Sequence, residues 1–380
     1  MLKVLQLIPT LDRSGAEKQM VLLARGLPRD RFRVEVATLT RHGPLLGELQ
    51  AEGIPVAAIG KRLKLDPWAF CRLVRFLKAG CYDVLHTWIF AANTYGRVAA
   101  RVARVPIVVT SEMAVDLWKG PIERRVDLAL AGWCDRLVGN SRAVVEFYRE
   151  LGVPQDRLQL IYSGIDELEP PVVNCAQLRV EFGFPPESPL VLFAGRLADQ
   201  KRVDDLLKAL DLLQHVQPDL RTLIAGDGPL RRQLEEMAGQ FELHDRVRFL
   251  GHRDDVPTLI AAADVVVLPS AYEGLPNLLL EAMRFRKPVV ATAAPGTTEA
   301  VVAGQTGILV PIGQPPQLAR AIRDLIRDPD LARRLGEAGR AHVETHFRLS
   351  EMIDRFATLY EELARSKGRL QPDGLNRTIS

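Results

Sequence analysis

Short apolar runs alternate with amphipathic stretches along almost the whole chain. Between the runs, apolar residues recur at helical spacing, whereas the runs themselves are too short for buried helices. This alternation predicts an α/β protein in which parallel strands are joined by helices, as in doubly wound sheets. The predicted strands are residues 4–8, 34–39, 56–59, 84–86, 107–110, 137–139, 190–194, 223–225, 247–250, 265–268, 289–292 and 308–310.

The alternation is interrupted once, between residues 167 and 189, where five prolines fall. A chain of 380 residues is long enough for two domains of ordinary size. We therefore predict two tandem Rossmann-like domains, followed by a long helical region that begins near residue 315. The predicted parts are an N-terminal domain (1–168), a C-terminal domain (169–345), a closing helix (346–366) and a polar tail (367–380) that is expected to be frayed.

The composition is that of a soluble globular protein, with 47% hydrophobic and 26% charged residues. No apolar run approaches the ~20 residues that a membrane-spanning helix needs. The apolar stretch at the N-terminus is too short for a signal peptide. The four cysteines show no C-x-x-C spacing, which argues against a disulfide framework or a zinc site and predicts a reducing, cytoplasmic location.

The net charge of +3 is unevenly distributed, because residues 1–168 hold 24 Lys and Arg against 18 Asp and Glu. A basic half predicts an acidic partner, although ordinary surface charge explains it equally well. Within residues 61–78, Lys and Arg alternate with Trp, Phe and Leu. This segment is either a helix that lies on anionic lipid at the inner face of a membrane or a helix that packs on its own sheet. Nucleic-acid binding is disfavoured, since no basic stretch is interleaved with aromatic residues at a suitable spacing.

The segment after the strand at 265–268 carries the clearest chemistry. Pro276 suits the first turn of a helix, and Gly274 lets a ligand approach the backbone closely. The start of such a helix offers free N–H groups and a partial positive charge to a phosphate. Glu273 and Glu281 flank this site, and carboxylates beside a phosphate should bind hydroxyls. Glu281, about one turn into the helix, suits a ribose diol, and Glu273 suits a sugar.

The turn after the strand at 190–194 carries two cations, Arg196 and Lys201. Two cations on one strand-to-helix turn suit a diphosphate, because a guanidinium binds two oxygens at once. In a parallel sheet the carboxyl ends of strands share one edge, so this turn and the Glu273 segment belong to the same site.

The string Glu273-Gly274-Leu275-Pro276-Asn277, with Glu281 following, resembles the signature of family 4 GT-B retaining glycosyltransferases (glycosyl transferases group 1). The resemblance implies two Rossmann-like domains that face each other across a cleft, with a C-terminal helix that returns to the N-terminal domain. It also implies transfer of a sugar from a nucleotide diphosphate sugar, with UDP as the favoured nucleotide and with retention at the anomeric carbon. The nucleotide sugar is then a substrate and no cofactor is needed. The implied acceptor is a glycan or a lipid-linked glycan of polysaccharide or glycoconjugate synthesis.

The resemblance assigns roles to individual residues. Arg196 and Lys201 would bind the diphosphate, Glu281 the ribose and Glu273 the transferred sugar, and His86 joins Glu273, Arg196 and Lys201 as a catalytic candidate. The further implied contacts of the donor are Gly15, Gly251, His252, Gly274, Leu275, Pro276 and Asn277. The implied contacts of the acceptor are Ala16, Glu17, His86, which is expected to point into the cleft, and Glu112.

The chain departs from the family pattern at four positions, and two of them bear on the acceptor. Trp88 stands where relatives often have a second His, and Glu112 stands where they often have His. Ser163 replaces the usual Asn before Gly164, and Arg286 replaces the usual Gly. The identity of the acceptor therefore stays open.

No D-x-D pair follows a strand, so protein cations are expected to replace a divalent metal. Retention permits a covalent intermediate or attack on the face that the leaving group occupies, and we favour the second. Three other classes are weaker. A nucleotide-sugar epimerase does not need the Glu273–Glu281 loop. A dinucleotide oxidoreductase would require a third glycine after Gly226 and Gly228. A non-catalytic binding module would have no reason to keep Arg196, Lys201 and Glu273 together.

Overall fold

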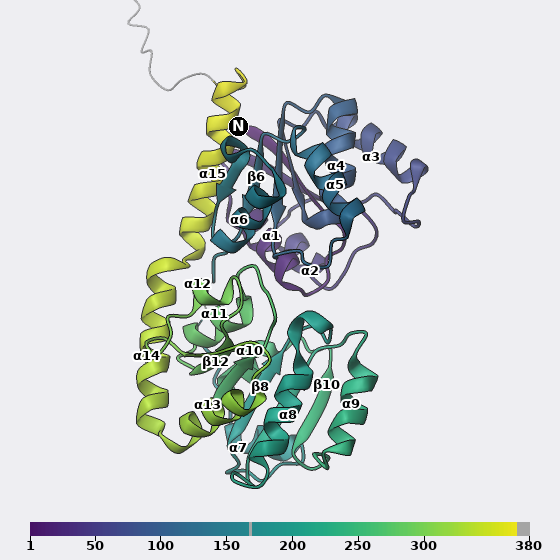
Figure 1. Cartoon of the computed structure of the whole chain (residues 1–380). Helices are drawn as coiled ribbons and strands as arrows, with labels where there is room; N and C mark the ends of the chain where they lie inside the picture. The colour runs from purple at the N-terminus through teal and green to yellow at the C-terminus, as the bar shows by residue number, and fades with distance from the viewer. Residues whose placement is uncertain (167–168, 371–380) are drawn as a thin grey trace, which may run out of the picture. The chain divides into compact units, whose positions relative to one another are not determined.

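The computed structural model describes residues 1–166 and 169–370, which form two compact units (Figure 1). Unit 1 comprises residues 1–164 and 349–370, and unit 2 comprises the described residues of 165–348. The chain thus leaves unit 1 after Gly164 and returns after Arg348, close to the predicted boundaries at 168 and 345. The part of the predicted tail that spans 371–380 lies outside the described residues.

Unit 1 is built on a seven-stranded parallel sheet in the order β3-β2-β1-β4-β5-β6-β7. Unit 2 has a six-stranded parallel sheet in the order β10-β9-β8-β11-β12-β13. These two sheets confirm the predicted α/β class and its two Rossmann-like domains. The strands of unit 1 are β1 (Leu2–Ile8), β2 (Phe32–Thr38), β3 (Val56–Ala58), β4 (Val84–Trp88), β5 (Ile107–Glu112), β6 (Arg136–Gly139) and β7 (Leu158–Leu160). Those of unit 2 are β8 (Leu190–Ala194), β9 (Arg221–Ala225), β10 (Val247–Gly251), β11 (Val265–Leu268), β12 (Val289–Thr292) and β13 (Ile308–Val310).

Helices cover both faces of the unit 1 sheet, and two separate apolar clusters lie beneath them. One cluster joins the sheet to α1, α2 and α15, and the other joins it to α3, α4, α5 and α6. The helices of unit 1 are α1 (Gly15–Gly26), α2 (Leu46–Ala51), α3 (Pro67–Gly80), α4 (Ile89–Ala103), α5 (Pro121–Ala131), α6 (Arg142–Leu151) and α15 (Leu349–Ser366). Those of unit 2 are α7 (Cys175–Glu181), α8 (Val203–Leu213), α9 (Arg231–Gln240), α10 (Val256–Ala262), α11 (Asn277–Arg284), α12 (Thr297–Ala300), α13 (Pro315–Arg327) and α14 (Pro329–His346). Single 3-10 turns precede β7 (Gln155–Arg157) and α8 (Asp199–Lys201).

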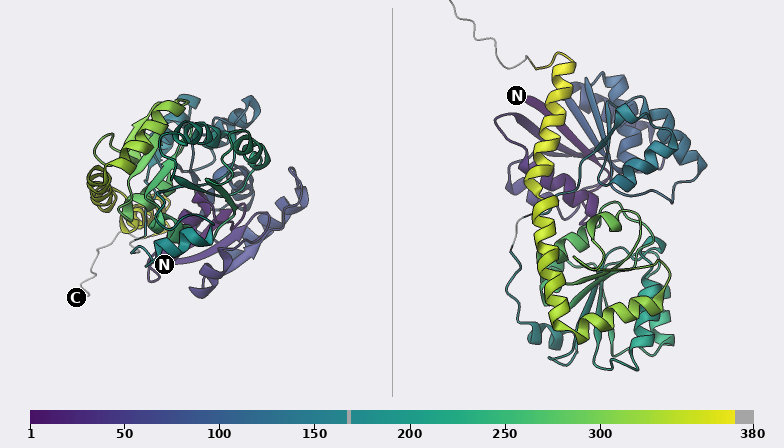
Figure 2. Two further views of the ribbon diagram at one scale, coloured as in Figure 1. Left: turned by 90° about the horizontal axis from the view of Figure 1, so that it is seen from below. Right: turned by 60° about the vertical axis from the view of Figure 1, so that its left-hand side comes forward.

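The last helix, α15, packs on the face of the unit 1 sheet that α1 also covers (Figure 2). Its buried side chains include Met352, Phe356 and Tyr360, which repeat at helical spacing. The Phe356 ring lies beside the rings of His86 and Trp88, with centroid distances of 5.2 and 6.2 Å. A helix more than 180 residues away in sequence from the rest of unit 1 therefore completes its core.

Replacing Phe356 by Ala should destabilise unit 1 by about 3–5 kcal/mol, since it opens a cavity beside two buried rings. Urea unfolding followed by tryptophan fluorescence would measure this, because buried Trp88 lies against Phe356. Thr358→Ala, at an exposed position of the same helix, is the control and should change stability by less than about 0.5 kcal/mol. Equal stabilities for the two variants would mean that α15 contributes no core to unit 1.

Candidate functional site

In unit 2 the strand order reverses direction between β8 and β11, which lie side by side at the centre of the sheet. In open parallel sheets a ligand binds beyond the carboxyl ends of the strands at such a switch point. The loops that follow these two strands, residues 195–201 and 269–277, contain the predicted donor residues except Gly15, Gly251, His252 and Glu281. The Ala271 N–H donates to the Gln200 carbonyl at 2.8 Å, so the two loops lie in contact.

An ion pair joins the two loops at their functional residues. The Lys201 Nζ lies 2.5 Å from Oε1 of Glu273, and the Glu273 residue is only 6% exposed. Gln200 adds a second link by donating from Nε2 to the Tyr272 carbonyl at 2.9 Å. The two residues assigned to the diphosphate and to the sugar thus meet directly, as the shared edge of the strands predicts.

The remaining polar groups of these loops differ in whether they have hydrogen-bond or ion-pair partners. The Arg196 side chain is exposed and makes no hydrogen bond or ion pair within the described part of the chain. The backbone N–H groups of Gly274 and Leu275, both buried residues, likewise donate to no acceptor in residues 1–166 or 169–370. Helix α11 begins at Asn277, and Glu281 lies one turn into it, as predicted. A cation and free amide donors at one switch point form a suitable environment for a diphosphate.

Two glycines allow neighbouring loops to pack against these segments. A Cβ atom on Gly226, which has φ of +130°, would lie 1.9 Å from the Gly195 carbonyl oxygen. A Cβ on Gly296, with φ of +79°, would lie 1.8 Å from the Gly274 carbonyl oxygen. The Gly226 N–H donates to the Gly251 carbonyl at 2.7 Å, and this contact fixes the end of β10, after which exposed His252 follows. Only glycine permits both the positive φ and the close approach.

The structure places His86 differently from the prediction. His86 has no exposed surface, and its Nδ1 and Nε2 lie 2.6 Å from Tyr360 Oη and 2.7 Å from Ser111 Oγ. Burial lowers the pKa of His86 to about 3, so the ring is neutral. The side chain therefore lies in the core beneath α15 and does not point toward a ligand-facing surface.

Glu17 also takes part in internal contacts. Thr10 Oγ1 donates to its Oε1 at 3.1 Å and Ser14 Oγ donates to its Oε2, so the carboxylate closes the loop between β1 and α1. Burial raises the pKa of Glu17 above its usual value. Ser14 and Glu17 have the spacing of a capping box, but the Ser14 hydroxyl donates to the Glu17 carboxylate and caps no backbone N–H group of α1. Gly15 and Ala16 open α1 between them, where Gly15 is exposed and Ala16 is half-buried.

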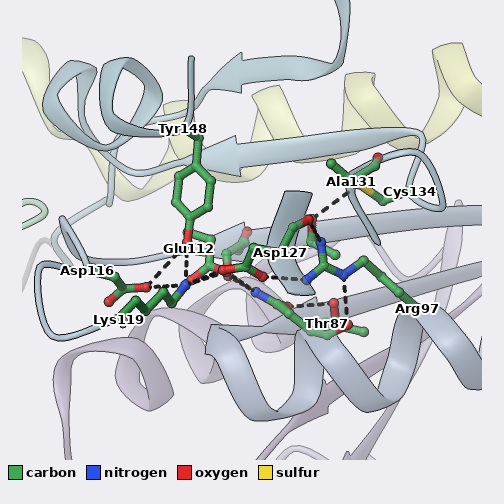
Figure 3. A network of polar contacts seen from close by, with 12 residues as sticks. Thr87, Arg97, Glu112, Asp116, Lys119, Asp127, Ala131, Cys134 and Tyr148 are labelled. Atoms are coloured by element: carbon green, nitrogen blue, oxygen red, sulfur yellow. Dashed lines mark hydrogen bonds and ion pairs between the residues drawn. The ribbon is translucent and has the colours of Figure 1, made fainter. Parts of the chain in front are cut away.

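Glu112 belongs to a buried network of charged groups (Figure 3). The network centres on Lys119, which has no exposed side-chain surface. Its Nζ lies 2.6 Å from Asp116 Oδ2, 2.7 Å from Asp127 Oδ2 and 3.6 Å from Glu112 Oε1, and it donates to Tyr148 Oη at 2.5 Å. The expectation that Glu112 contacts an acceptor is therefore not matched by this placement, because the carboxyl is only 2% exposed and is used internally.

Two further members complete the network, and no sequence pattern predicted them. Arg97 Nη2 donates to Asp127 Oδ1 at 2.6 Å, and Asn93 Nδ2 donates to Glu112 Oε1 at 2.8 Å. Two cations thus face three carboxyls, and the charges balance when one carboxyl is protonated. Burial raises the pKa of Glu112 to about 7, so Glu112 is the group that takes the proton. The members come from helices α4, α5 and α6, the end of β5 and the loop that follows it, and no spacing in the sequence connects them.

Glu112→Gln should change how the stability of unit 1 depends on pH. The pKa of Glu112 is about 7 in the folded chain and near 4.5 in the unfolded chain, so the folded state holds the extra proton between these values. The contribution of Glu112 to the wild-type free energy of unfolding should therefore fall as pH rises through this window, by at most about 1.4 kcal/mol per pH unit, and it opposes the rising contribution of His86, whose extra proton is held by the unfolded chain. Glutamine stays neutral and should remove that slope, while the exposed Glu150→Gln should keep it. Urea unfolding over this pH range measures the slopes, and equal slopes in all three proteins would contradict the assignment of the proton.

Neither a metal centre nor a transmembrane segment emerges from the described residues. Within residues 1–166 and 169–370, no three His, Cys, Asp or Glu side chains are grouped as metal ligands. In the same ranges no helix has the length and hydropathy to cross a bilayer.

The chain matches two family models. Glycosyltransferase Family 4 matches residues 13–167, and Glycosyl transferases group 1 matches residues 176–342. The first match lies almost wholly in unit 1. The second contains every predicted donor residue of unit 2.

Individual relatives and solved structures agree with these matches. Alpha-D-kanosaminyltransferase of Streptomyces kanamyceticus is 32% identical over 289 residues, which cover 72% of this chain and 75% of the relative. UDP-Gal:alpha-D-GlcNAc-diphosphoundecaprenol alpha-1,3-galactosyltransferase of Escherichia coli is 26% identical and covers 95% of this chain and 97% of the relative. The structure of HepE from Anabaena in complex with UDP and glucose superimposes with a TM-score of 0.86 at 25% identity, covering 95% of this chain and 100% of HepE.

None of these matches supports the epimerase alternative. The neighbours in structure are GT-B glycosyltransferases, in agreement with the two parallel sheets. The chain therefore belongs to the glycosyl transferases group 1 family and is a glycosyltransferase that uses a nucleotide sugar.

Proposed function

We propose that the protein transfers a sugar from a UDP-sugar to a hydroxyl group of a glycan or lipid-linked glycan, with retention at the anomeric carbon. The observation that carries the proposal is the contact between Lys201 and Glu273 at the switch point of unit 2. The complex of HepE with UDP and glucose supports UDP as the nucleotide. The name of the Escherichia coli relative, which includes a sugar on diphosphoundecaprenol, supports a lipid-linked acceptor.

The donor roles follow from the charges of the two loops. The diphosphate binds Arg196, Lys201 and the free N–H groups of Gly274 and Leu275. When the phosphate takes Lys201 as its partner, Glu273 is released to accept hydrogen bonds from the sugar hydroxyls. The ion pair therefore keeps both charges neutralised until the donor binds. Lys201 and Glu273 then separate, and each binds its own part of the donor. A charge that lost its partner without this exchange would be costly at such a buried position.

The other donor contacts lie on neighbouring elements of unit 2. Glu281 on α11 binds the ribose hydroxyls, and the backbone around Gly251 and His252 forms part of the pocket for the base. Pro276 and Asn277 bring the start of α11 to the phosphates. In unit 1 the opening of α1 at Gly15 and Ala16 is proposed to face phosphate or acceptor.

The reaction is proposed to proceed on one face of the sugar. The bond between the anomeric carbon and the phosphate oxygen breaks, the acceptor oxygen bonds to the same face, and its proton passes to the departing phosphate oxygen. Negative charge grows on the diphosphate, where Arg196, Lys201 and the amide donors stabilise it. No covalent intermediate is invoked, since Glu273, once released from Lys201, is assigned to the sugar hydroxyls.

A lipid-linked acceptor would require a protein that works at the inner face of a membrane without crossing it. We therefore propose a cytoplasmic enzyme with a peripheral membrane contact through unit 1.

Nucleotide binding should separate the roles of the two carboxylates. Glu281→Ala should weaken UDP itself, because its partner is the ribose, whereas Glu273→Ala should weaken a UDP-sugar far more than UDP. Thermal-shift and calorimetric titrations with UDP and with a panel of UDP-sugars would measure this, since a ligand of the native state raises its stability. Glu187→Ala, an exposed carboxylate of unit 2, is the matched control. Equal losses for both ligands in both variants would refute the division of roles, and no stabilisation by any nucleotide would refute the donor site.

Transfer should continue in EDTA, because protein cations and amide donors supply the positive charge that a metal would otherwise bring. Arg196→Ala should lower kcat by about 10²–10³-fold, as losing one stabilising donor typically does. Arg196 is exposed, so its loss leaves no buried group unpaired, and the exposed Arg232→Ala serves as control. A transfer assay with and without EDTA decides the matter. Activity that disappears with EDTA and returns with magnesium would show that a metal is required.

A further inference from the structure

Two loops of unit 1 carry strongly exposed apolar side chains. The first, between β3 and α3, presents Leu63, Leu65 and Trp68, which are 65%, 81% and 79% exposed. The second, between β5 and the first turn of α5, presents Leu117, Trp118 and Ile122, which are 50%, 56% and 72% exposed. We call these six residues the apolar rim. Side chains of this size are rarely so exposed in a group without a partner.

The two loops lie on the same side of unit 1, because both pack against the first turns of α4. The Asp66 N–H donates to Tyr95 Oη at 2.8 Å, and the Phe90 ring lies at right angles to the Trp118 ring with centroids 5.6 Å apart. Helices α3, α4 and α5 are seen together on one side of the sheet in Figure 1. Helix α4 follows β4 directly, and α3 and α5 follow the loops after β3 and β5. The rim, which lies in these two loops and at the starts of α3 and α5, is therefore at the carboxyl edge of the sheet.

The rim is surrounded by positive charge. Within residues 61–80 the basic side chains are Lys61, Arg62, Lys64, Arg72, Arg75 and Lys78. The one acidic residue of that stretch, Asp66, is 7% exposed and is occupied in accepting from the backbone N–H groups of Arg62 and Ala69. In and just after the second loop lie exposed Arg125, half-buried Arg124 and half-buried Glu123, while Asp116 is buried against Lys119. Basic side chains next to the rim therefore outnumber acidic ones.

Both loops are held in fixed conformations. Asp66 caps α3 through Ala69, and Pro67 occupies the first helical position. In the second loop Lys119 follows Trp118 directly and is pinned in the interior by Asp116 and Asp127. The exposed positions of Trp118 and Ile122 thus follow from the burial of the lysine between them. The rim is a rigid surface, and no reordering is needed to present it.

We propose that the apolar rim docks unit 1 on an anionic lipid bilayer, with Leu and Trp side chains entering the headgroup region and the surrounding Lys and Arg facing lipid phosphates. Charge complementarity favours this occupant, because cations flank the apolar tips and the carboxylates of Asp66 and Asp116 are turned inward. Tryptophan with leucine beside Lys and Arg is the composition of surfaces that lie in a membrane interface. The tips also alternate with cations along the chain from Lys61 to Trp68, whereas the core of a protein–protein interface is depleted in charge. This docking uses no residue of the donor site; it rests on the peripheral membrane contact proposed for unit 1 and names the surface that makes it.

The experiment is co-sedimentation of the full chain with vesicles. Wild type should bind vesicles that contain phosphatidylglycerol, bind pure phosphatidylcholine vesicles far less, and lose binding as ionic strength rises. A rim variant, Leu63→Gln with Leu65→Gln and Trp68→Gln, and a charge variant, Arg62→Gln with Lys64→Gln, should each bind the anionic vesicles at least about tenfold more weakly. The control variant, Val172→Gln with Val216→Gln, replaces exposed apolar residues of unit 2 and should bind as wild type does.

Two further measurements keep the outcome unambiguous. Stabilisation by UDP should be equal in all variants, which shows that each is folded and that loss of lipid binding is separate from the donor site. Fluorescence quenching by brominated lipid should be strong in wild type and largely lost in Trp68→Phe with Trp118→Phe. Absence of binding to anionic vesicles, equal binding to neutral ones, or unchanged binding by the rim variant would overturn the proposal. So would light scattering that shows a dimer dissociated by the rim variant without any lipid binding, since the rim would then join two copies of the chain.

Discussion

The donor loops of unit 2 depend on a steric constraint, which is that four backbone segments must meet at one edge of a parallel sheet. The loops after β8, β9, β11 and β12 all approach the switch point, and at two positions there is no room between them for a Cβ atom. Gly226 against Gly195 and Gly296 against Gly274 are the positions at which backbone contacts backbone. Because this packing is rigid, Lys201 and Glu273 reach each other across the switch point at hydrogen-bonding distance. The ion pair is thus a consequence of the glycines as much as of its own charges.

Units 1 and 2 use their polar side chains in opposite ways at the ends of their strands. In unit 2 they remain at the edge, where Arg196 is exposed and the N–H groups of Gly274 and Leu275 find no acceptor among the described residues. In unit 1 they are turned inward and bonded to one another, as His86 is to Tyr360 and Glu112 is to Asn93. The polar residues of unit 1 therefore stabilise its own loops and core, whereas those of unit 2 are available to a ligand.

This contrast explains how far the sequence could be interpreted. The strands of unit 2 and the meeting of the Arg196 and Glu273 loops were predictable, because parallel strands bring their carboxyl ends to one edge whatever their length. Strand β7 was missed because its three residues show no pattern of their own. The departure at Arg286 was visible in the sequence, and its physical meaning is now clear. Arg286 has φ of +57°, the left-handed conformation in which relatives usually place glycine.

The interior positions of His86 and Glu112 were not predictable from local sequence. The local sequence around a polar residue at the end of a strand is the same whether or not a distant helix covers that residue in the fold. His86 is covered by Tyr360, which lies 274 residues further along the chain, and Glu112 meets a lysine that any local pattern would place at the surface. The part of the rim before α3 was visible only as a basic, apolar segment, for which packing on the sheet and contact with lipid were both open. In the structure α3 packs on the sheet through Leu73 and Leu77, which are buried, and leaves Trp68 exposed.

The buried network and the rim are connected through Lys119, which follows Trp118, and through Asp116, whose Oδ1 accepts from Trp118 Nε1 at 3.0 Å. This connection explains why so many charges are kept inside unit 1. Burying Lys119, Arg97 and three carboxyls is not an efficient way to stabilise a domain, because apolar side chains of the same volume would often serve as well. A fully paired network does, however, fix the loop from which it is built, since removing any partner would leave a buried charge alone. Lys119 is anchored on the inside, and its neighbours Trp118 and Ile122 are thereby held on the outside. A surface that must enter a lipid interface gains from such an anchor, because apolar side chains on a mobile loop would collapse onto the protein. The charge network thus keeps the rim exposed.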